Sequence, residues 1–190
     1  MIIKEAIKDV PKDMPIRILF QDEIRCGRIN NSRRCWVPMK ERPIVSQQIV
    51  REFVYAIGAV SPMDGKFTSL IMPWIDTEIM SIFLTHTSLE FKNDFCLMFL
   101  DKAGWHTTNE LYVPENMKLL FLPPYSPELN PVEPIWRYLR ENYFRNYCFS
   151  SLDEVENILC SGLCYLGENP SLVFSLTCFD WIKTLSLTSK

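Results

Sequence analysis

Four short apolar runs limit what this chain can fold into more than any other feature. They are "IRILF" at 16–20, "FVYAIGAV" at 53–60, "FCLMFL" at 95–100 and "KLLFL" at 118–122. Each is rich in branched or aromatic side chains, which is typical of a buried β-strand. Sheets built from such strands are covered by helices. We therefore expect a sheet flanked by helices.

Segments with helical spacing lie between the later strands or follow them. One begins at Asp76, a second follows the proline-rich segment 122–134, and a third begins behind Ser151 in a capping box. His86 falls on the apolar side of the first of these helices and is expected in the core. A short helix is also expected over 107–113. Strands in a row, followed by strands alternating with helices, predict an α/β protein with a mixed central sheet.

Length and composition predict a single domain. The chain has 190 residues, 47% of them hydrophobic, and a net charge of −3. We expect one domain over 16–190 behind a lead-in over 1–15. This charge gives no global sign of nucleic-acid binding, so local patches must carry that argument. Seven scattered cysteines indicate free thiols, and no window resembles a signal peptide or membrane span, which together predict a cytoplasmic protein without membrane contact.

Two of the apolar runs are followed by carboxylates. Asp22 follows the first run and Asp101 the third. If these strands are parallel neighbours, both carboxylates meet at the edge where open α/β sheets place ligands. Two acids so close repel each other, which raises one pKa or requires a bridging cation. Oxygen ligands without a sulfur or imidazole cluster favour magnesium or manganese.

A third carboxylate, Glu133, is delivered by the proline-rich segment 122–134. Prolines fix φ, so this connection is stiff. Glu133 would complete a clamp for two metal ions about 3.5–4 Å apart, as used for displacement at phosphorus. Two placements are open. With Asn130 as N-cap and Pro131 first, Glu133 is the third helical residue, whereas a helix that begins at Pro134 leaves it just outside.

Each acid also has a plain structural interpretation. Asp22 and Asp101 could be loop residues or caps, and Glu133 an ordinary glutamate of a first helical turn. A glycosidase could use paired acids as acid and base, although the pattern of sugar-stacking loops is lacking. Asp22 and Glu23 are adjacent on a strand and therefore point to opposite faces, so Glu23 is expected beside the ligands or facing solvent.

Basic residues gather in two places. The stretch 25–42 has a net charge of +5 and contains Asn30-Asn31, a plausible hairpin turn, and further arginines follow Glu133. Phosphate contacts supply most non-specific DNA affinity. A solvated hairpin is the alternative. The candidate DNA-binding residues are Arg25, Arg28, Arg33, Arg34, Arg137 and Arg140.

Three motifs together resemble the catalytic half of an insertion-sequence transposase. They are "FQDE" at 20–23, "FLDKAGWH" at 99–106 and "LPPYSPELNPVEPIWRYLR" at 122–140. The chain resembles the IS six-thirty group, the bacterial branch of the mariner superfamily of DDE transposases, over about 16–145.

The resemblance implies an RNase H-like fold with Asp22, Asp101 and Glu133 as catalytic residues and metal ligands. It also implies two Mg²⁺ (or Mn²⁺) ions. Such enzymes cleave transposon ends hydrolytically and then join the freed 3′-hydroxyl to target DNA.

Two departures from the family pattern affect these expectations. Lys102 stands where the family commonly has Asn, and it would compete with metal if it points into the site. His106 is kept, and we expect Glu23, Lys102 and His106 around the metal ligands. The chain begins too close to Asp22 to include the family's N-terminal helix-turn-helix region. We therefore expect the downstream frame of a split element.

The expected partners are DNA, a helix-turn-helix product of an upstream frame, and a second copy in a homodimer. Two other functions stay open on the sequence. One is an RNase H-like nuclease or resolvase without strand transfer, and the other is an inactive or domesticated DNA-binding remnant.

Overall fold

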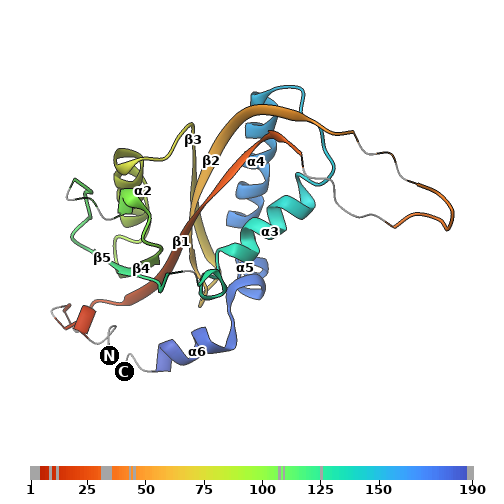
Figure 1. Ribbon diagram of the computed structural model, residues 1–190. Coiled ribbons are helices and arrows are strands. Elements are labelled where there is room, and N and C mark those ends of the chain that lie inside the picture. Colours follow the sequence, from red (N-terminus) through yellow and green to blue (C-terminus); the bar gives the residue numbers. More distant parts are fainter. Residues whose placement is uncertain are drawn as a thin grey trace.

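A five-stranded mixed sheet forms the centre of the protein (Figure 1). The computed structural model describes residues 5–187 except 9, 12, 31–35, 43, 45, 107, 109 and 125. The sheet order is β3-β2-β1-β4-β5. Strands β1, β2 and β3 pair antiparallel in turn, while β4 is parallel to both β1 and β5. The strands are β1 (Ile16–Ile29), β2 (Ile49–Ser61), β3 (Lys66–Met72), β4 (Phe95–Leu100) and β5 (Met117–Phe121).

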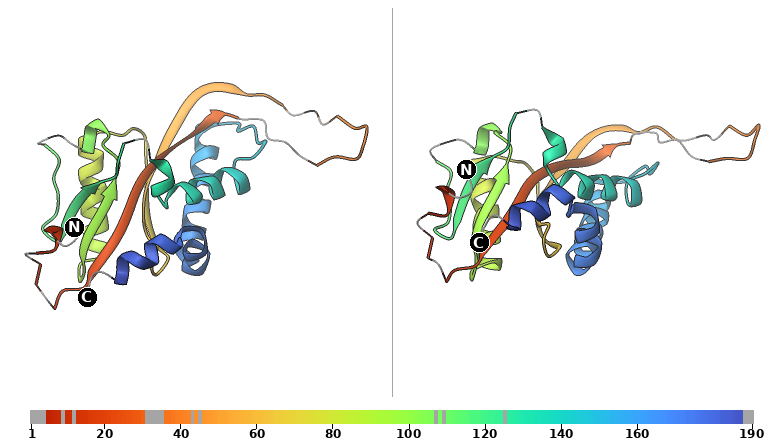
Figure 2. Two further views of the ribbon diagram at one scale, coloured as in Figure 1. Left: turned by 60° about the horizontal axis from the view of Figure 1, so that its bottom comes forward. Right: turned by 90° about the horizontal axis from the view of Figure 1, so that it is seen from below.

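Helices cover both faces of this sheet, as the sequence predicts (Figures 1 and 2). Helix α2 packs on one face in a hydrophobic cluster with β4, and α3, α4 and α5 pack on the other in a second cluster with β1 and β2. Between the strands and helices lie two 3₁₀ turns, η1 (Gly104–His106) and η2 (Pro127–Leu129). The helices are α2 (Thr77–Glu90), α3 (Glu133–Asn142), α4 (Leu152–Glu168), α5 (Pro170–Thr177) and α6 (Asp180–Leu187).

Alternation along β1 decides which side chains meet which helices. Leu19 is buried in the cluster of α2, while Phe20 and Ile24 are buried in the cluster of α3, α4 and α5. Successive strand side chains point to opposite faces, so Asp22 shares the face of α3. Glu23 lies on the opposite face.

Strand β1 is longer than predicted. It continues through Asp22, which pairs with Gly58 of β2, and ends only at Ile29. The reason is that Ile24 and Cys26 keep the alternation going and are buried against the helices. The parallel pairing with β4 stops at Phe20 and Phe99. Asp22 and Asp101 each lie two residues beyond that last pair, so their predicted proximity holds although Asp22 does not end its strand.

The predicted hairpin between the first two strands exists, but its turn does not lie at Asn30. The Asn30 backbone N–H donates to the Gln48 carbonyl at 3.2 Å, so the two strands are still paired there. Residues 36–42 of the connection lie away from the body (Figure 1). Asn31 lies outside the described residues.

Two smaller predictions are wrong. Helix α2 begins behind Asp76, whose carboxylate accepts from the Ile79 N–H at 2.8 Å, but His86 is 45% exposed rather than in the core. The buried side of α2 instead comprises Ile79, Met80, Phe83, Leu84 and Thr87. Residues 110–113 form no helix, and positions 107 and 109 of the predicted segment are not described.

None of the described helices is both long enough and apolar enough to cross a lipid bilayer.

Candidate active site

The three predicted carboxylates line one hollow of about 390 Å³. Asp22 comes from the middle of β1, Asp101 directly follows β4, and Glu133 is the first residue of α3. The remaining wall is formed mostly by the proline-rich segment, from Leu122 to Asn130. Residues more than a hundred positions apart in the chain are thereby gathered around a single opening.

The pKa of Asp22 shows that the three acids disfavour one another's negative charge. Its Oδ1 accepts from the Glu23 N–H at 2.9 Å. Burial, together with the negative charges of Glu23, Glu133 and Asp101, raises the pKa of Asp22 to about 7. Desolvation and like charge both disfavour a second anion at such a place. A cation that ligates these carboxylates would remove that penalty.

Asp101 is held on one side only. Its Oδ1 accepts from the Ala103 N–H at 2.9 Å and lies 3.0 Å from His106 Nδ1. Its side chain is 65% exposed. Among the described residues, no hydrogen-bond donor reaches Asp101 Oδ2 or either carboxylate oxygen of Glu133. These open oxygens, with that of Asp22, are the donor set that magnesium and manganese prefer.

The donor set thus fits a divalent ion by chemistry and by its shared opening. Within the described part of the chain, however, no three His, Cys, Asp or Glu side chains are already grouped closely enough to hold an ion. Glu133 would therefore have to adjust its side chain on binding.

Asn130 fixes the proline-rich segment to the sheet. Its side chain is buried, its Nδ2 donates to the Gln21 carbonyl at 3.0 Å, and its Oδ1 accepts from the Val132 N–H at 3.2 Å. Gln21 immediately precedes Asp22. One amide therefore ties the start of α3 to the part of β1 that carries the first acid.

Helix α3 begins at Glu133 with Val132 as its N-cap, which differs from both predicted placements. Pro134 is the second helical residue, where a backbone N–H has no intrahelical partner to lose. Gly58 of β2, the partner of Asp22, lets the helix approach closely, because a Cβ there would lie 2.7 Å from the Trp136 ring. Pro134 and the close packing at Gly58 both favour a helix that starts at Glu133.

Glu23 and His106 form a buried connection behind Asp101. Glu23 Oε1 lies 3.1 Å from His106 Nε2 and accepts from Trp105 Nε1 at 3.1 Å. Burial alone would raise the pKa of Glu23 and lower that of His106. Their mutual hydrogen bond and opposite charge outweigh burial, so the pKa of Glu23 is lowered and that of His106 raised. Trp105 was not among the predicted site residues, although the adjacent ring donors of "WH" were a signal for it.

Lys102 lines the same hollow as the three acids. The part of the structure that is described shows no ion pair between Lys102 and any of them. A cation placed at this edge would compete electrostatically with a metal ion.

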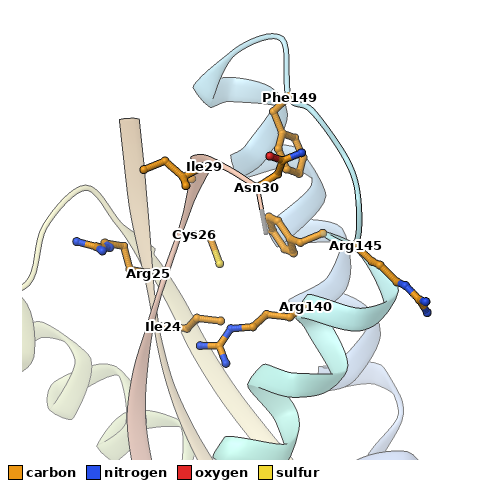
Figure 3. Close-up of a pocket in the computed structure, with 10 residues that line it drawn as sticks. Ile24, Arg25, Cys26, Ile29, Asn30, Arg140, Arg145 and Phe149 are labelled. Atoms are coloured by element: carbon orange, nitrogen blue, oxygen red, sulfur yellow. The ribbon is translucent and has the colours of Figure 1, made fainter. Parts of the chain in front are cut away.

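Those predicted DNA-binding arginines that the structure describes do not form one patch. Figure 3 shows Arg140 of α3 reaching toward β1 near Ile24 and Cys26, where a hollow of about 110 Å³ opens. Arg25 lines this hollow too, but its side chain points away from α3 and its guanidinium lies 4.5 Å from the centre of the Phe53 ring.

The other candidate arginines differ in their surroundings. Arg28 donates to Glu52 at 2.7 Å and to the Phe149 carbonyl at 3.0 Å, so its charge is already neutralised. Arg137 is exposed on α3, and Arg33 and Arg34 lie outside the described residues.

Comparison with solved structures defines the fold. A Mos1 mariner paired-end complex with Mn matches 92% of this chain and 57% of that chain, with a TM-score of 0.61 and 14% identity. The catalytic domain of Mos1 mariner transposase matches with a TM-score of 0.52 and 13% identity, over 92% of this chain and 87% of that one. The fold is thus the RNase H-like one that the sequence resemblance implies. The chain spans under three-fifths of the Mos1 chain in the paired-end complex.

Sequence comparison gives the family. The profile of the DDE superfamily endonucleases matches residues 17–156. The uncharacterized protein y4pE/y4sA of Sinorhizobium fredii (strain NBRC 101917 / NGR234) is 38% identical over 130 residues, which are 68% of this chain and 96% of that protein. The chain belongs to the DDE superfamily endonuclease family.

Proposed function

We propose that this chain is the catalytic domain of an insertion-sequence transposase of the IS six-thirty type, which cleaves DNA and transfers the cleaved strand. The observation that carries the proposal is the hollow shared by Asp22, Asp101 and Glu133 in a chain of the DDE endonuclease family. Bringing three acids together there does not stabilise the fold, because their negative charges repel one another.

Asp22, Asp101 and Glu133 would hold two Mg²⁺ or Mn²⁺ ions. Neighbouring structures support that choice, since Mos1 paired-end complexes are described with Mn and with Mg. Bound between such carboxylates, divalent ions activate an attacking oxygen and stabilise the leaving one. The three carboxylates would hold those ions beside the reacting phosphate. The partly buried Asp22 and the stiff proline-rich segment limit side-chain movement during the reaction.

The reaction has two phosphoryl transfers at this one site. First, a water oxygen bonds to the scissile phosphorus and the P–O3′ bond breaks, which leaves a 3′-hydroxyl and a 5′-phosphate. Next, the oxygen of that 3′-hydroxyl gives up its proton and bonds to a phosphorus of target DNA, while the P–O3′ bond of the target breaks and the leaving oxygen takes up a proton to become a target 3′-hydroxyl. Neither step consumes a further reactant.

We infer that the DNA partners are transposon ends and a target duplex. A Mos1 complex with its left transposon end is among the similar structures, with a TM-score of 0.57. Arg137 and Arg140 follow Glu133 on α3 and would contact phosphates next to the reacting one. A helix-turn-helix product of an upstream frame would supply end recognition, and a homodimer would bring two ends together.

The direct test is metal-dependent nicking of supercoiled DNA by the whole chain. Asp22→Asn, Asp101→Asn and Glu133→Gln should each lower the rate at least about a hundredfold, because each removes charge stabilisation from the transition state. Glu128→Gln is the matched control, since Glu128 is exposed in the same segment and lies outside the hollow. Full nicking by any of the three acid variants would overturn the proposal.

Two further assays sharpen this test. Joining of pre-cleaved ends to target DNA separates a transposase from a nuclease or resolvase, which would nick without joining. Lys102→Asn should raise nicking at low metal concentration, because a competing cation is removed from the hollow. A chain that nicks under none of these conditions, with its metal site intact, would be the inactive remnant.

A further inference from the structure

Glu23 is connected to both aspartates of the candidate site, directly to Asp22 and through His106 to Asp101. Its backbone N–H donates to Asp22 Oδ1 at 2.9 Å. Its carboxylate lies 3.1 Å from His106 Nε2, and the other ring nitrogen of His106 lies 3.0 Å from Asp101 Oδ1. One residue of β1 is therefore connected to the ligand beside it and to the ligand beyond β4.

This connection is built inside the protein rather than on its surface. The His106 side chain is fully buried and that of Glu23 is 12% exposed, whereas the Asp101 side chain is 65% exposed. Trp105 Nε1 adds a second donor to Glu23 at 3.1 Å. Glu23 and His106 are held by burial, whereas the Asp101 carboxylate is exposed. The hydrogen bonds from Glu23 through His106 can therefore orient the Asp101 carboxylate.

The atoms that face the imidazole define its role. His106 Nε2 faces a carboxylate, while Nδ1 faces the Asp101 carbonyl and carboxylate oxygens, each at 3.0 Å. Both ring nitrogens therefore face acceptor oxygens, and the ring can donate a hydrogen bond toward either side. The bond from Nδ1, with that from the Ala103 N–H, occupies Asp101 Oδ1 and leaves Oδ2 for a ligand.

We propose that Glu23 and His106 are positioning residues that fix the Asp101 carboxylate for metal binding before any ion arrives. This inference rests on the proposed function, because it needs Asp101 to be a metal ligand. Outer groups that orient ligands in this way typically contribute about 10–100-fold in metal affinity. Neither residue touches the reacting phosphate, so their loss should be compensated by more metal.

The test is the affinity of the whole chain for Mn²⁺ alone, measured by calorimetry, with thermal unfolding recorded for every variant. His106→Ala should weaken Mn²⁺ binding about 10–100-fold. His106→Asn should retain much of the affinity, because its amide nitrogen falls near the position of Nδ1 and still reaches Asp101. His106→Gln, whose amide falls near Nε2, should resemble the alanine variant.

Two features of the chain make this test specific. His86 is the other histidine of the sequence, and it is exposed on α2, so His86→Gln is the matched control and should bind Mn²⁺ like wild type. Glu23→Gln keeps the backbone contact to Asp22 but weakens the hold on His106, and it should fall between wild type and His106→Ala. In nicking assays, saturating Mn²⁺ should restore the maximal rate of each positioning variant.

The outcomes separate the two proposals. Unchanged Mn²⁺ affinity in folded His106→Ala, or equal affinities in the asparagine and glutamine variants, would overturn the positioning role and leave the metal site standing. A lowered melting temperature with unchanged affinity would show a purely structural histidine. If Asp101→Asn binds Mn²⁺ as tightly as wild type, the proposed function itself fails. Should His106→Ala not fold, Glu23→Gln and the asparagine–glutamine pair still decide the matter.

Discussion

Carboxylates gather at both ends of the parallel pair β1 and β4, but among the described residues only the group at the start of the strands is paired with an arginine. At the end where both strands begin, Arg17 donates to Asp94 at 2.5 Å, to Asp64 at 2.6 Å and to Ser61 at 3.0 Å. At the other end, Asp22 and Asp101 meet Glu133 around an open hollow. Carboxylates of the same kind are therefore paired with an arginine at one end of the sheet and left without one at the other.

The pKa shifts of the two groups have opposite directions. Burial opposes ionisation of Asp64, but hydrogen bonds and the charge of Arg17 outweigh it and lower the pKa of Asp64. Burial and neighbouring anions raise the pKa of Asp22 to about 7. Acids whose charge is neutralised by an arginine of the same chain stabilise the fold. Acids left with excess negative charge can instead bind a cation from solution.

Removing the cation of the neutralised group should cause the largest loss of stability. Arg17→Met leaves Asp94 poorly solvated and without its partner, which should lower the free energy of unfolding by about 3 kcal/mol. Chemical denaturation at neutral pH measures this change. Arg51→Met, an exposed arginine of β2, is the control. A loss below about 1 kcal/mol would mean that the Arg17 group behaves like a surface ion pair.

Supplying a cation to the other group should stabilise the protein by a similar amount. At a Mn²⁺ concentration about a hundred times its dissociation constant, the free energy of unfolding should rise by about 2.7 kcal/mol. Thermal unfolding with and without Mn²⁺ measures it, and Asp22→Asn should show little of the shift. Equal stabilisation of wild type and Asp22→Asn would place the ion elsewhere.

Without metal, Asp22 should destabilise the folded state at high pH. Burial and neighbouring anions raise its folded pKa from the ordinary 3.8 to about 7, so the folded state binds the extra proton between these values. The contribution of Asp22 to the free energy of unfolding should therefore fall as pH rises from about 4 to 7 and level off above. Relative to wild type, Asp22→Asn should gain up to about 4 kcal/mol of stability between pH 4 and pH 8, because one pKa unit corresponds to about 1.4 kcal/mol. Denaturation curves in EDTA test this, and parallel pH profiles would contradict it.

The smallest expected effect concerns the contribution of arginines outside the acid site to DNA affinity. Arg140→Gln should reduce the slope of log affinity against log salt by about one, because one phosphate contact is lost. Arg28→Gln should change it less, since Glu52 already neutralises Arg28. Fluorescence anisotropy of a labelled duplex across a salt series measures both. A larger loss of slope in Arg28→Gln would reverse this assignment.

The sequence predicted the elements better than their junctions. Continuous apolar runs revealed the strands because burial on both faces leaves a pattern within a few residues. The extension of β1 past Asp22 depends on pairing with β2, which no local pattern reports. The start of α3 was misassigned for a related reason. Asn130 looked like a helix cap, but its amide is used to bind Gln21, 109 positions away.

The sequence indicated the residues of the candidate site better than the contacts between them. Asp22, Asp101 and Glu133 were indicated by strand ends, by the stiff proline-rich segment and by family resemblance, and Glu23 and His106 were expected around them. The contact between Glu23 and His106 spans 83 positions, and its geometry exists only once β1 and β4 are paired. The bonds that hold ligands in place are thus harder to predict than the ligands themselves.

The central claim is that the un-neutralised acids form one metal site. Diffraction from crystals soaked in Mn²⁺, recorded for its anomalous signal, tests this most directly. Anomalous density is expected among the carboxylates of Asp22, Asp101 and Glu133, and it should be lost in Asp101→Asn. Mn²⁺ density elsewhere on the chain, with these three carboxylates left without a bound ion, would contradict it.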